Sequence, residues 1–528
     1  MKQLHKILTF SIILLVSVSS CKKDALNLTP VNDKTSTDVY ATPAGYKNSL
    51  VKLYASFGLT GSGGSGASDI GGLDAGFADF LRLFWMSQEL TTDEAICSWG
   101  DVGIPELNTS LWSTDNTFLR GLYSRAMYQI TVSNEFLRES TPEKLASRNI
   151  SGADATTINQ YRAEARFLRA FQYWVLMDGF GNPPFVTEDD AIGKVAPKQI
   201  SRAELFNYVE SELKAIETEL PDARSNEYGR ADKGAAWALL ARLYLNAQVY
   251  AGTPKYTEAI TYSSKVINAG YSLSTTYKNL FLTDNHITSK NELILTLNYD
   301  GMRGENFGGT TYLINAAVNA EMVPASFGIP NGGWGGNRSL SNLPLSFADR
   351  TGNTDKRAMF FGTKVATDDP GVFSDGLRVT KFRNLSSTGV AAPSNGGSMS
   401  SLDFPLFRLA EQYLIYGEAV ARGGSGGNQA TALTYFNNLR QRAYGNATGN
   451  VTSLNVNLFL EERARELYWE GFRRTDLVRY GKFTDGSYLW PFKGGVKAGT
   501  ALAETRNLFP IPTADLIANT NLVQNPGY

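Results

Sequence analysis

Cysteine and histidine are almost absent from this 528-residue sequence, which holds two of each. Cys97 is the single cysteine beyond the N-terminal segment, so an intrachain disulfide framework and multi-thiolate metal sites are excluded. His286 is likewise the single histidine beyond that segment, which disfavours histidine-dependent triads and two-histidine zinc sites. We expect His286 to be an exposed loop residue.

An excess of charge and a long internal hydrophobic run are also missing. Lys and Arg total 50 against 51 acidic residues, so no net field attracts nucleic acid. No stretch after the N-terminus approaches the 18 or so apolar residues that span a bilayer. The sequence predicts a protein without transmembrane helices or nucleic-acid partners in its main part.

The N-terminus has the pattern of a secretory leader. Lys2 and Lys6 precede an apolar run at residues 7–18, and small residues then lead to Cys21. This order resembles the lipobox of bacterial lipoproteins, in which the cysteine is acylated and becomes the new N-terminus. We predict a signal peptide at residues 1–20 and a lipid on Cys21; the alternative is an ordinary signal peptide with an incidental cysteine.

Helical periodicity dominates several long segments. Apolar residues recur with helical spacing over 161–181, and residues 201–220 open with Ser201 and Glu204, a capping box. The pattern WxxLAxxY at 237–244 matches the first helix of a tetratricopeptide repeat, and a second helix is expected from about 257 to 268. The segment from Leu406 repeats that spacing, and its partner helix carries Ala432 and Phe436.

A different pattern covers roughly residues 271–405. The segment 292–297 is the best strand candidate, and loops rich in Gly, Asn and Ser surround it at 328–341 and 383–401. The Gly-rich stretch at 61–76 formally contains a GxGxxG pattern, but no strand leads into it, so we interpret it as a flexible surface loop. The predicted fold is mainly α: a tetratricopeptide-like helical scaffold with an irregular, loop-rich half that carries a few short strands.

Seven segments, in order along the chain, resemble the SusD/RagB family of outer-membrane lipoproteins, and in particular a starch-binding member. They are QELTTDEAICSW (88–99), RAEARFLRAFQYW (162–174), GRADKGAAWALLARLYLNAQVY (229–250), NFGGTTYL (306–313), FPLFRLAEQYL (404–414), EGFRRTDLVRYGKF (470–483) and FPIPTADL (509–516).

The resemblance implies a non-enzymatic lipoprotein on the extracellular face of the outer membrane. Family members capture oligosaccharides and deliver them to a TonB-dependent transporter of the SusC type. The expected ligand is starch or a malto-oligosaccharide, and no cofactor is expected. The implied organisation is an N-terminal region at 21–270 with the tetratricopeptide-like helices and a C-terminal region at 271–528, together forming one compact unit.

A neutral sugar offers hydroxyl groups and an apolar C–H face, and the hydroxyls add little net energy because water already satisfied them. Aromatic rings therefore carry much of the contact, and an arc of rings suits the coil of an α-1,4 glucan. By resemblance, the binding rings are Trp99, Phe307 and Trp334, and Arg82 and Asp74 add polar contacts. From the sequence alone, Trp99 also fits a core position, whereas Trp334 lies in PNGGWGGN, which has no apolar face to bury it.

The sequence departs from the starch-binding relative at several positions. Phe307 lacks the hydroxyl of the relative's tyrosine, and Val102 replaces an asparagine, for which Asp101 is the candidate substitute. The relative's calcium ligands are only partly kept: Asp403 remains, whereas His286 and Ser401 replace two aspartates. We therefore predict no metal.

A charged helix is predicted from about Leu458. Its Glu and Asp residues alternate with arginines, and the pairs Glu461–Arg465 and Glu470–Arg474 have i,i+4 spacing. We interpret it as a solvated or internally paired face rather than a catalytic carboxylate pair. Three alternatives to the starch-binding hypothesis stay open: a different glycan ligand, a glycoside hydrolase, and an adaptor that binds only proteins.

Overall fold

A computed structural model describes residues 34–193 and 195–528 of the chain. The predicted signal peptide and the lipidation site at Cys21 lie outside these residues. Within the two described ranges, no helix has both the length and the apolar character needed to cross a bilayer.

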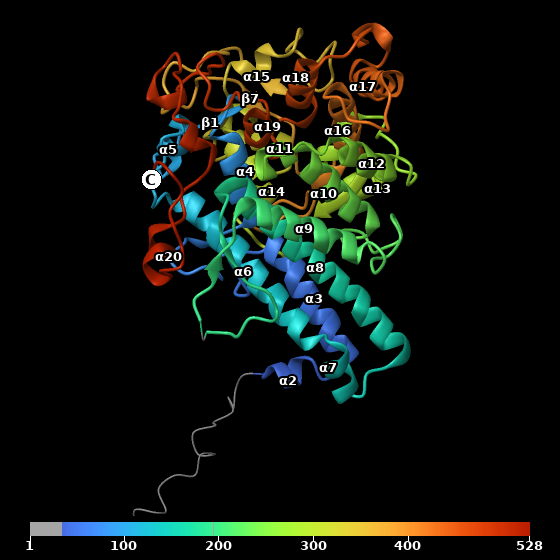
Figure 1. Ribbon diagram of the computed structural model, residues 1–528. Helices are drawn as coiled ribbons and strands as arrows, with labels where there is room; N and C mark the ends of the chain where they lie inside the picture. Colours follow the sequence, from blue (N-terminus) through green and yellow to red (C-terminus); the bar gives the residue numbers. More distant parts are fainter. Residues whose placement is uncertain (1–33, 194) are drawn as a thin grey trace, which may run out of the picture.

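Helices form most of the regular structure (Figure 1). The longer helices are α3 (Pro43–Gly58), α4 (Phe80–Glu89), α6 (Thr117–Glu139), α8 (Gly152–Phe180), α9 (Arg202–Ile216), α10 (Lys233–Leu245), α12 (Tyr256–Ile267), α14 (Gly309–Ala317), α16 (Leu409–Ala421), α17 (Gln429–Tyr444) and α18 (Val456–Leu467). The short helices include α2 (Ser36–Val39), α5 (Ile104–Thr109), α7 (Pro142–Ser147), α11 (Ala247–Ala251), α13 (Asn285–Thr288), α15 (Asn342–Leu345), α19 (Arg473–Arg479) and α20 (Thr513–Ala518).

The predicted helical scaffold is confirmed. Helix α6 packs on α8, α8 on α9, α10 on α12, α12 on α16 and α16 on α17, so neighbouring helices form a continuous array. The α10–α12 and α16–α17 pairs are the predicted repeat-like hairpins, and Ala432 and Phe436 of α17 are buried. Helices α6, α8 and α3 run together toward the end of the molecule that carries α2 and α7, and α17 and α18 lie at the opposite end (Figure 1).

Local sequence signals set several helix ends. Ser201 and Glu204 form the predicted capping box at the start of α9. Helix α8 begins at Gly152, well before the apolar pattern at 161. The sequence pattern did not show this start because the first turns are mostly exposed and carry no apolar periodicity. Its end is as expected, since Gly181 follows with a positive φ of 72°.

The loop-rich half is an insertion between α12 and α16. It is closed by antiparallel pairing of β4 (Leu293–Leu297) with β8 (Phe404–Arg408), which confirms the predicted strand. Residues 406–408 were expected to open a helix, but they belong to β8, and α16 starts at Leu409. The other pairs are β1 (Ala95–Cys97) with β5 (Asn337–Ser339), β2 (Pro184–Phe185) with β3 (Lys198–Gln199), and β6 (Phe360–Phe361) with β7 (Arg378–Val379).

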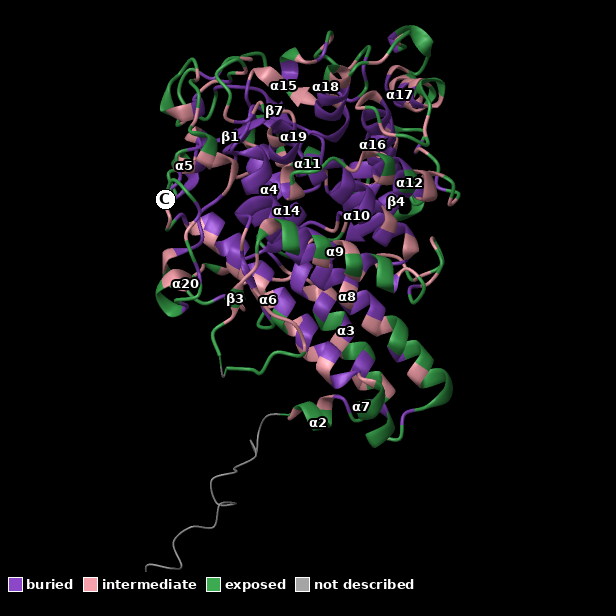
Figure 2. Ribbon diagram, in the orientation of Figure 1, coloured by how far each residue is buried: buried purple, intermediate pink, exposed green. Residues whose placement is uncertain are grey.

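One large hydrophobic core joins the scaffold and the insertion. Figure 2 shows α4, α10 and α14 as almost wholly buried, whereas the far ends of α3 and α8 carry exposed residues. The Gly-rich segment at 61–76 is a loop of turns between α3 and α4, and no strand leads into it. A nucleotide-binding strand–turn–helix arrangement is therefore not present there.

The predicted charged helix is two helices, α18 and α19, separated by a break. Trp469 and Gly471 have positive φ values of 63° and 85° in this break. The Glu461–Arg465 contact forms at 3.8 Å. The predicted Glu470–Arg474 contact is wrong because Glu470 lies in the break, so the two residues are not one turn apart on a single helix. Arg474 instead donates to the backbone of residue 507.

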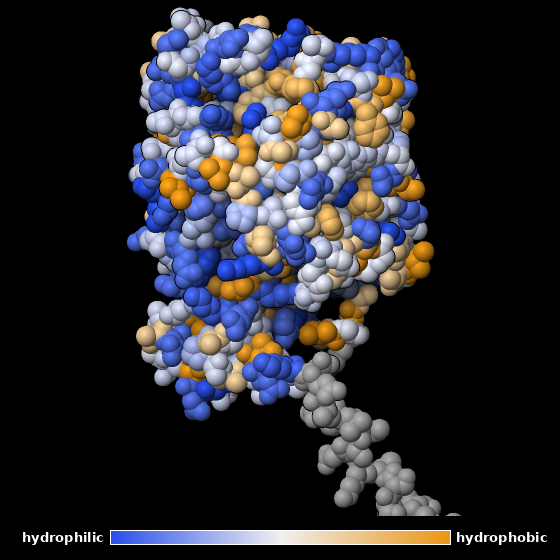
Figure 3. Space-filling model, turned by 180° about the vertical axis from the view of Figure 1, so that it is seen from behind, coloured by the Kyte–Doolittle hydropathy of each residue, from blue (hydrophilic) through white to orange (hydrophobic). Residues whose placement is uncertain are grey.

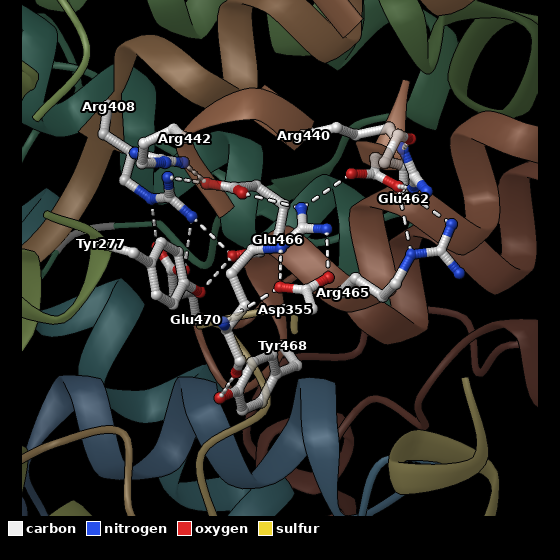
Figure 4. A network of polar contacts seen from close by, with 12 residues as sticks. Tyr277, Asp355, Arg408, Arg440, Arg442, Glu462, Arg465, Glu466, Tyr468 and Glu470 are labelled. Atoms are coloured by element: carbon white, nitrogen blue, oxygen red, sulfur yellow. Dashed lines mark hydrogen bonds and ion pairs between the residues drawn. The ribbon is translucent and has the colours of Figure 1, made fainter. Parts of the chain in front are cut away.

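The acidic residues of this segment mostly point inward to a buried ion network (Figure 4). Glu466 accepts from Arg408 at 2.7 Å and from Arg357 at 3.1 Å, and it also pairs with Arg442. Glu470 accepts from Arg408 at 2.7 Å and from Lys381 at 2.7 Å. These carboxylates are internally paired, which was one of the two alternatives predicted for this segment; the other was a solvated face.

Candidate functional site

Pairing of β1 with β5 brings the two predicted tryptophans to the same region. Trp99 follows β1 and Trp334 precedes β5, and the strands are antiparallel, so the two flanking segments meet. The backbone N–H of Ser98 donates to the carbonyl of Gly336 at 3.0 Å. Both indoles are half-buried, which answers the open question about Trp99: it is neither an enclosed core residue nor a free surface ring.

Trp99 packs directly on the backbone of Gly336. A Cβ atom at Gly336 would lie 2.4 Å from Nε1 of Trp99, and the φ of this glycine is 115°. Only glycine fits this position, because both the space and the backbone conformation exclude a side chain. The edge of Tyr312 supports the same indole, with ring centroids 6.0 Å apart.

Asn315, at the end of α14, fixes the loop that carries Trp334. Its backbone carbonyl accepts from the N–H of Trp334 at 2.9 Å, and its side-chain oxygen accepts from the N–H of Gly333 at 3.0 Å. The amide nitrogen of Asn315 donates to the carbonyls of Thr311 and Ser398. Trp334 is therefore presented by a fixed loop, which limits the entropy lost when a ligand binds.

Phe307 lies next to Trp334 and is 39% exposed. The two ring centroids are 6.3 Å apart and the planes are inclined by 51°. Asp79, the N-cap of α4, holds this segment, because its carboxylate accepts from Asn306 at 2.6 Å and from the N–H of Gly309 at 2.8 Å. The inclination gives these two rings a bent rather than a flat surface.

Arg82 is 3% exposed and lies behind the rings. Its guanidinium carbon is 4.3 Å from the ring centroid of Tyr312 and 5.7 Å from that of Trp99. Nη1 donates to the carbonyl of Gly76 at 2.7 Å, and within the described residues Arg82 forms no ion pair with a carboxylate. Burial lowers the pKa of Arg82 from its ordinary value, but arginine stays protonated at any physiological pH.

Asp74 joins the same group through Gly76. Its carboxylate accepts from the N–H of Gly76 at 2.8 Å, and a Cβ atom at Gly76 would lie 3.5 Å from Cβ of Phe307. Asp101 is exposed two residues after Trp99, and Val102 beside it is also exposed. The structure thus places all six predicted site residues in or beside one continuous group.

Asp79 and Tyr312 were missed by sequence reasoning. Asp79 links α4 to the Phe307 segment, and the Tyr312 ring contacts both the Arg82 guanidinium and the Trp99 indole. A helix start at residue 80 with Asp before it was a usable signal for Asp79. No comparable signal existed for Tyr312, because the contacts it makes join segments more than 200 residues apart.

A hollow with a volume of about 700 Å³ is lined by His286, Ser401 and Asp403, the positions that the resemblance matches to calcium ligands. Nδ1 of His286 is 4.0 Å from Oδ2 of Asp403, and burial raises the pKa of Asp403 to about 6. His286 is exposed as expected, but it lies on the one-turn helix α13 and not in a loop. Across residues 34–193 and 195–528, no three His, Cys, Asp or Glu side chains are grouped closely enough to hold a metal ion.

The sequence has clear relatives. Residues 295–528 match the family described as SusD family, and residues 105–245 match the one described as Starch-binding associating with outer membrane. Starch-binding protein SusD of Bacteroides thetaiotaomicron is 35% identical, over 97% of this chain and 96% of its own length. This chain belongs to the SusD family.

Three further relatives have lower sequence identity to this chain. SusD-like protein P2 of Formosa agariphila is 24% identical over 80% of this chain and 83% of its own length. A SusD homolog of Bacteroides thetaiotaomicron has a TM-score of 0.74 at 19% identity, covering 94% of this chain and 99% of its own. A laminarin binding SusD-like protein has a TM-score of 0.70 at 22% identity, covering 92% and 99%. The SusD fold is thus shared by this chain and proteins of quite different sequence.

Proposed function

We propose that this protein binds starch-like α-glucans, without cleaving them, on the aromatic surface formed by Trp99, Phe307 and Trp334. The observation that carries the proposal is the geometry of these rings: two half-buried indoles and an exposed phenyl are held by fixed backbone, and Phe307 is inclined by 51° to Trp334. A bent aromatic surface suits a coiled sugar chain. The 35% identity to Starch-binding protein SusD supports the same ligand class.

Arg82, Asp74 and Asp101 are the polar groups proposed to contact sugar hydroxyls. Nε of Arg82 has no hydrogen-bond partner among the described residues, but this atom is buried, so the side chain would have to shift to donate it to a sugar hydroxyl. Three rings contributing about 0.5–1.5 kcal/mol each beyond plain burial give weak binding, with a Kd of about micromolar to millimolar. Weak binding suits a protein that must release its ligand to a transporter, and a long polymer raises the effective affinity through repeated contacts.

A different glycan is the second candidate ligand, because Phe307 and Val102 depart from the starch-binding relative and because a laminarin binding protein shares the fold. Isothermal titration with maltoheptaose, β-cyclodextrin, laminarin, xylan and inulin separates the two candidates. Heat from both α-glucans and none from the other glycans supports the starch proposal. Absence of heat with either α-glucan refutes it.

The proposed location is the extracellular face of the outer membrane, with a lipid on Cys21 as the anchor. On the face shown in Figure 3, hydrophobic residues occur in small groups among hydrophilic ones, so this face does not present a broad apolar surface for a bilayer. The Cys21→Ser variant is expected to leave the membrane fraction. Retention of that variant in washed membranes would contradict the lipid anchor.

The proposed partner is a SusC-type TonB-dependent transporter. A Trp99→Ala plus Trp334→Ala variant should lose glycan binding and still co-purify with the transporter, because the rings are proposed to serve the glycan alone. Loss of both activities would show that the aromatic surface also serves the protein contact. Incubation of the purified protein with maltoheptaose should release no reducing ends above a blank, and steady release would support the hydrolase alternative.

A further inference from the structure

The segment from Lys364 to Arg378 forms a compact loop beside the aromatic surface. The carboxylate of Asp375 organises it by accepting from the backbone N–H groups of Asp368 at 2.9 Å and Asp369 at 3.2 Å. Lys364 also donates to Asp375, at 2.5 Å. These contacts close the loop on itself.

Two buried arginines attach this loop to the rest of the site. Arg338 of β5 donates to the carbonyl of Val372 at 2.6 Å and to that of Pro370 at 2.9 Å, and it also contacts the hydroxyl of Ser98. Arg378 of β7 donates to the carbonyl of Phe373. Within the described residues neither arginine pairs with a carboxylate, and apart from the Ser98 contact their hydrogen bonds hold the backbone carbonyls of residues 370–373.

The side chains at the tip of this fixed loop are apolar and accessible. Phe373 is 45% exposed and Val372 is 40% exposed. A Cβ atom at Gly335, the residue directly after Trp334, would lie 3.5 Å from Cδ1 of Phe373. Phe373 therefore borders the same short segment, 334–336, that carries Trp334 and supports Trp99.

Exposure of a phenyl ring to water costs free energy, but single exposed apolar residues are common on protein surfaces. Phe373 differs from a scattered surface residue because its backbone is held by two buried guanidinium groups and because its ring borders Gly335, the residue directly after Trp334. A ring held in place before binding can stack on a sugar without the usual cost of ordering a loop. Accessible apolar groups gathered in one place indicate a contact surface.

We propose that Phe373 is a further stacking position of the glycan site, which takes an additional glucose unit beyond those held by Trp99, Phe307 and Trp334. The proposal rests on the proposed function, because it assigns a second segment of the same α-glucan chain to the loop at 364–378. Phe373 then sets a preference for longer chains: a short oligosaccharide covers the three rings, and a longer one also reaches the fourth.

Calorimetric titration of the mature protein with maltotriose and maltoheptaose tests this assignment. Phe373→Ala should weaken maltoheptaose binding about two- to tenfold, as expected for one lost stacking contact, and leave maltotriose binding within about twofold. Phe373→Tyr should keep the affinity for both, since it preserves the ring. Phe361→Ala is the matched control, because Phe361 is 41% exposed on β6 of the same hairpin and lies outside the group of rings.

The outcomes separate this proposal from the function on which it rests. A wild-type protein that binds neither glucan refutes the proposed function and the stacking position with it. Wild-type binding together with an unchanged maltoheptaose affinity in Phe373→Ala overturns the stacking position alone. Equal weakening of both sugars also overturns it, because that result assigns Phe373 to support of the Trp334 segment and not to an added sugar unit.

Discussion

Neutralising Glu466 should destabilise the fold strongly, because this carboxylate is fully buried among three arginines. Arg357, Arg408 and Arg442 all contact it, and its side chain has no exposed surface. The change Glu466→Gln keeps the shape and removes the negative charge. The three arginines then have one carboxylate fewer in a buried region that excludes water. Loss of a buried ion pair costs far more free energy than loss of a surface pair.

The structure sets the expected size of this effect. Breaking a buried pair costs about 3–5 kcal/mol in general. Here Arg408 still has Glu470 and Glu292, and Arg357 still has Asp355 and Glu462, so neither is left without a carboxylate. We therefore expect a loss of about 3 kcal/mol in the free energy of unfolding, at the lower end of that range.

Urea unfolding followed by tryptophan fluorescence measures this loss, and Glu461→Gln is the matched control. Glu461 lies on the same helix, but its side chain is 60% exposed and its contact with Arg465 is 3.8 Å long. A surface pair of this kind contributes about 0–1 kcal/mol, so the control should unfold almost like wild type. If Glu466→Gln unfolds within about 1 kcal/mol of Glu461→Gln, the reasoning about the buried network is wrong.

Three further predictions follow from single contacts. Burial opposes ionisation of Glu462, but Arg357 and two other arginines outweigh burial and lower its pKa from 4.5 to about 2. The contribution of Glu462 to the free energy of unfolding is therefore complete above pH 4.5 and should disappear as the pH falls toward 2. A constant free energy of unfolding between pH 5 and pH 3 would contradict this. Gly336→Ala should weaken α-glucan binding about tenfold in a titration, because the added Cβ displaces the Trp99 indole, and an unchanged Kd would show that this indole is not part of the site. Phe307→Tyr should tighten α-glucan binding by about two- to tenfold by adding a hydroxyl that can bond to the sugar, and weaker binding would place this ring away from the sugar hydroxyls.

Helices with apolar periodicity were predictable from the sequence, and so was the short strand β4. The start of α8 at Gly152 was not, because its first turns face solvent and leave no apolar pattern. The break between α18 and α19 was also missed. It depends on a left-handed backbone conformation at Trp469, and tryptophan is not a residue type from which this conformation can be predicted. The division of the chain at residue 270 stays a prediction.

The residues proposed for the candidate site come from the family resemblance and stay a prediction, whereas the contacts that hold them could not be predicted from the sequence. Trp99 and Phe307 lie in matching segments and Trp334 lies outside them, but the pairing of β1 with β5 across more than 230 residues is what brings Trp99 and Trp334 to one region. Such pairing cannot be read from strands of three residues each. Phe373 also lies outside the matching segments. Its place beside the Trp334 segment is visible only from its packing against Gly335.

Calorimetric titration of maltoheptaose into wild-type protein and into the Trp99→Ala plus Trp334→Ala variant tests the central claim most directly. We predict measurable micromolar to millimolar binding by the wild type and none by the variant, with equal circular dichroism spectra for the two proteins. Binding of the same strength by both proteins would show that α-glucans are recognised elsewhere, or by means other than these two rings.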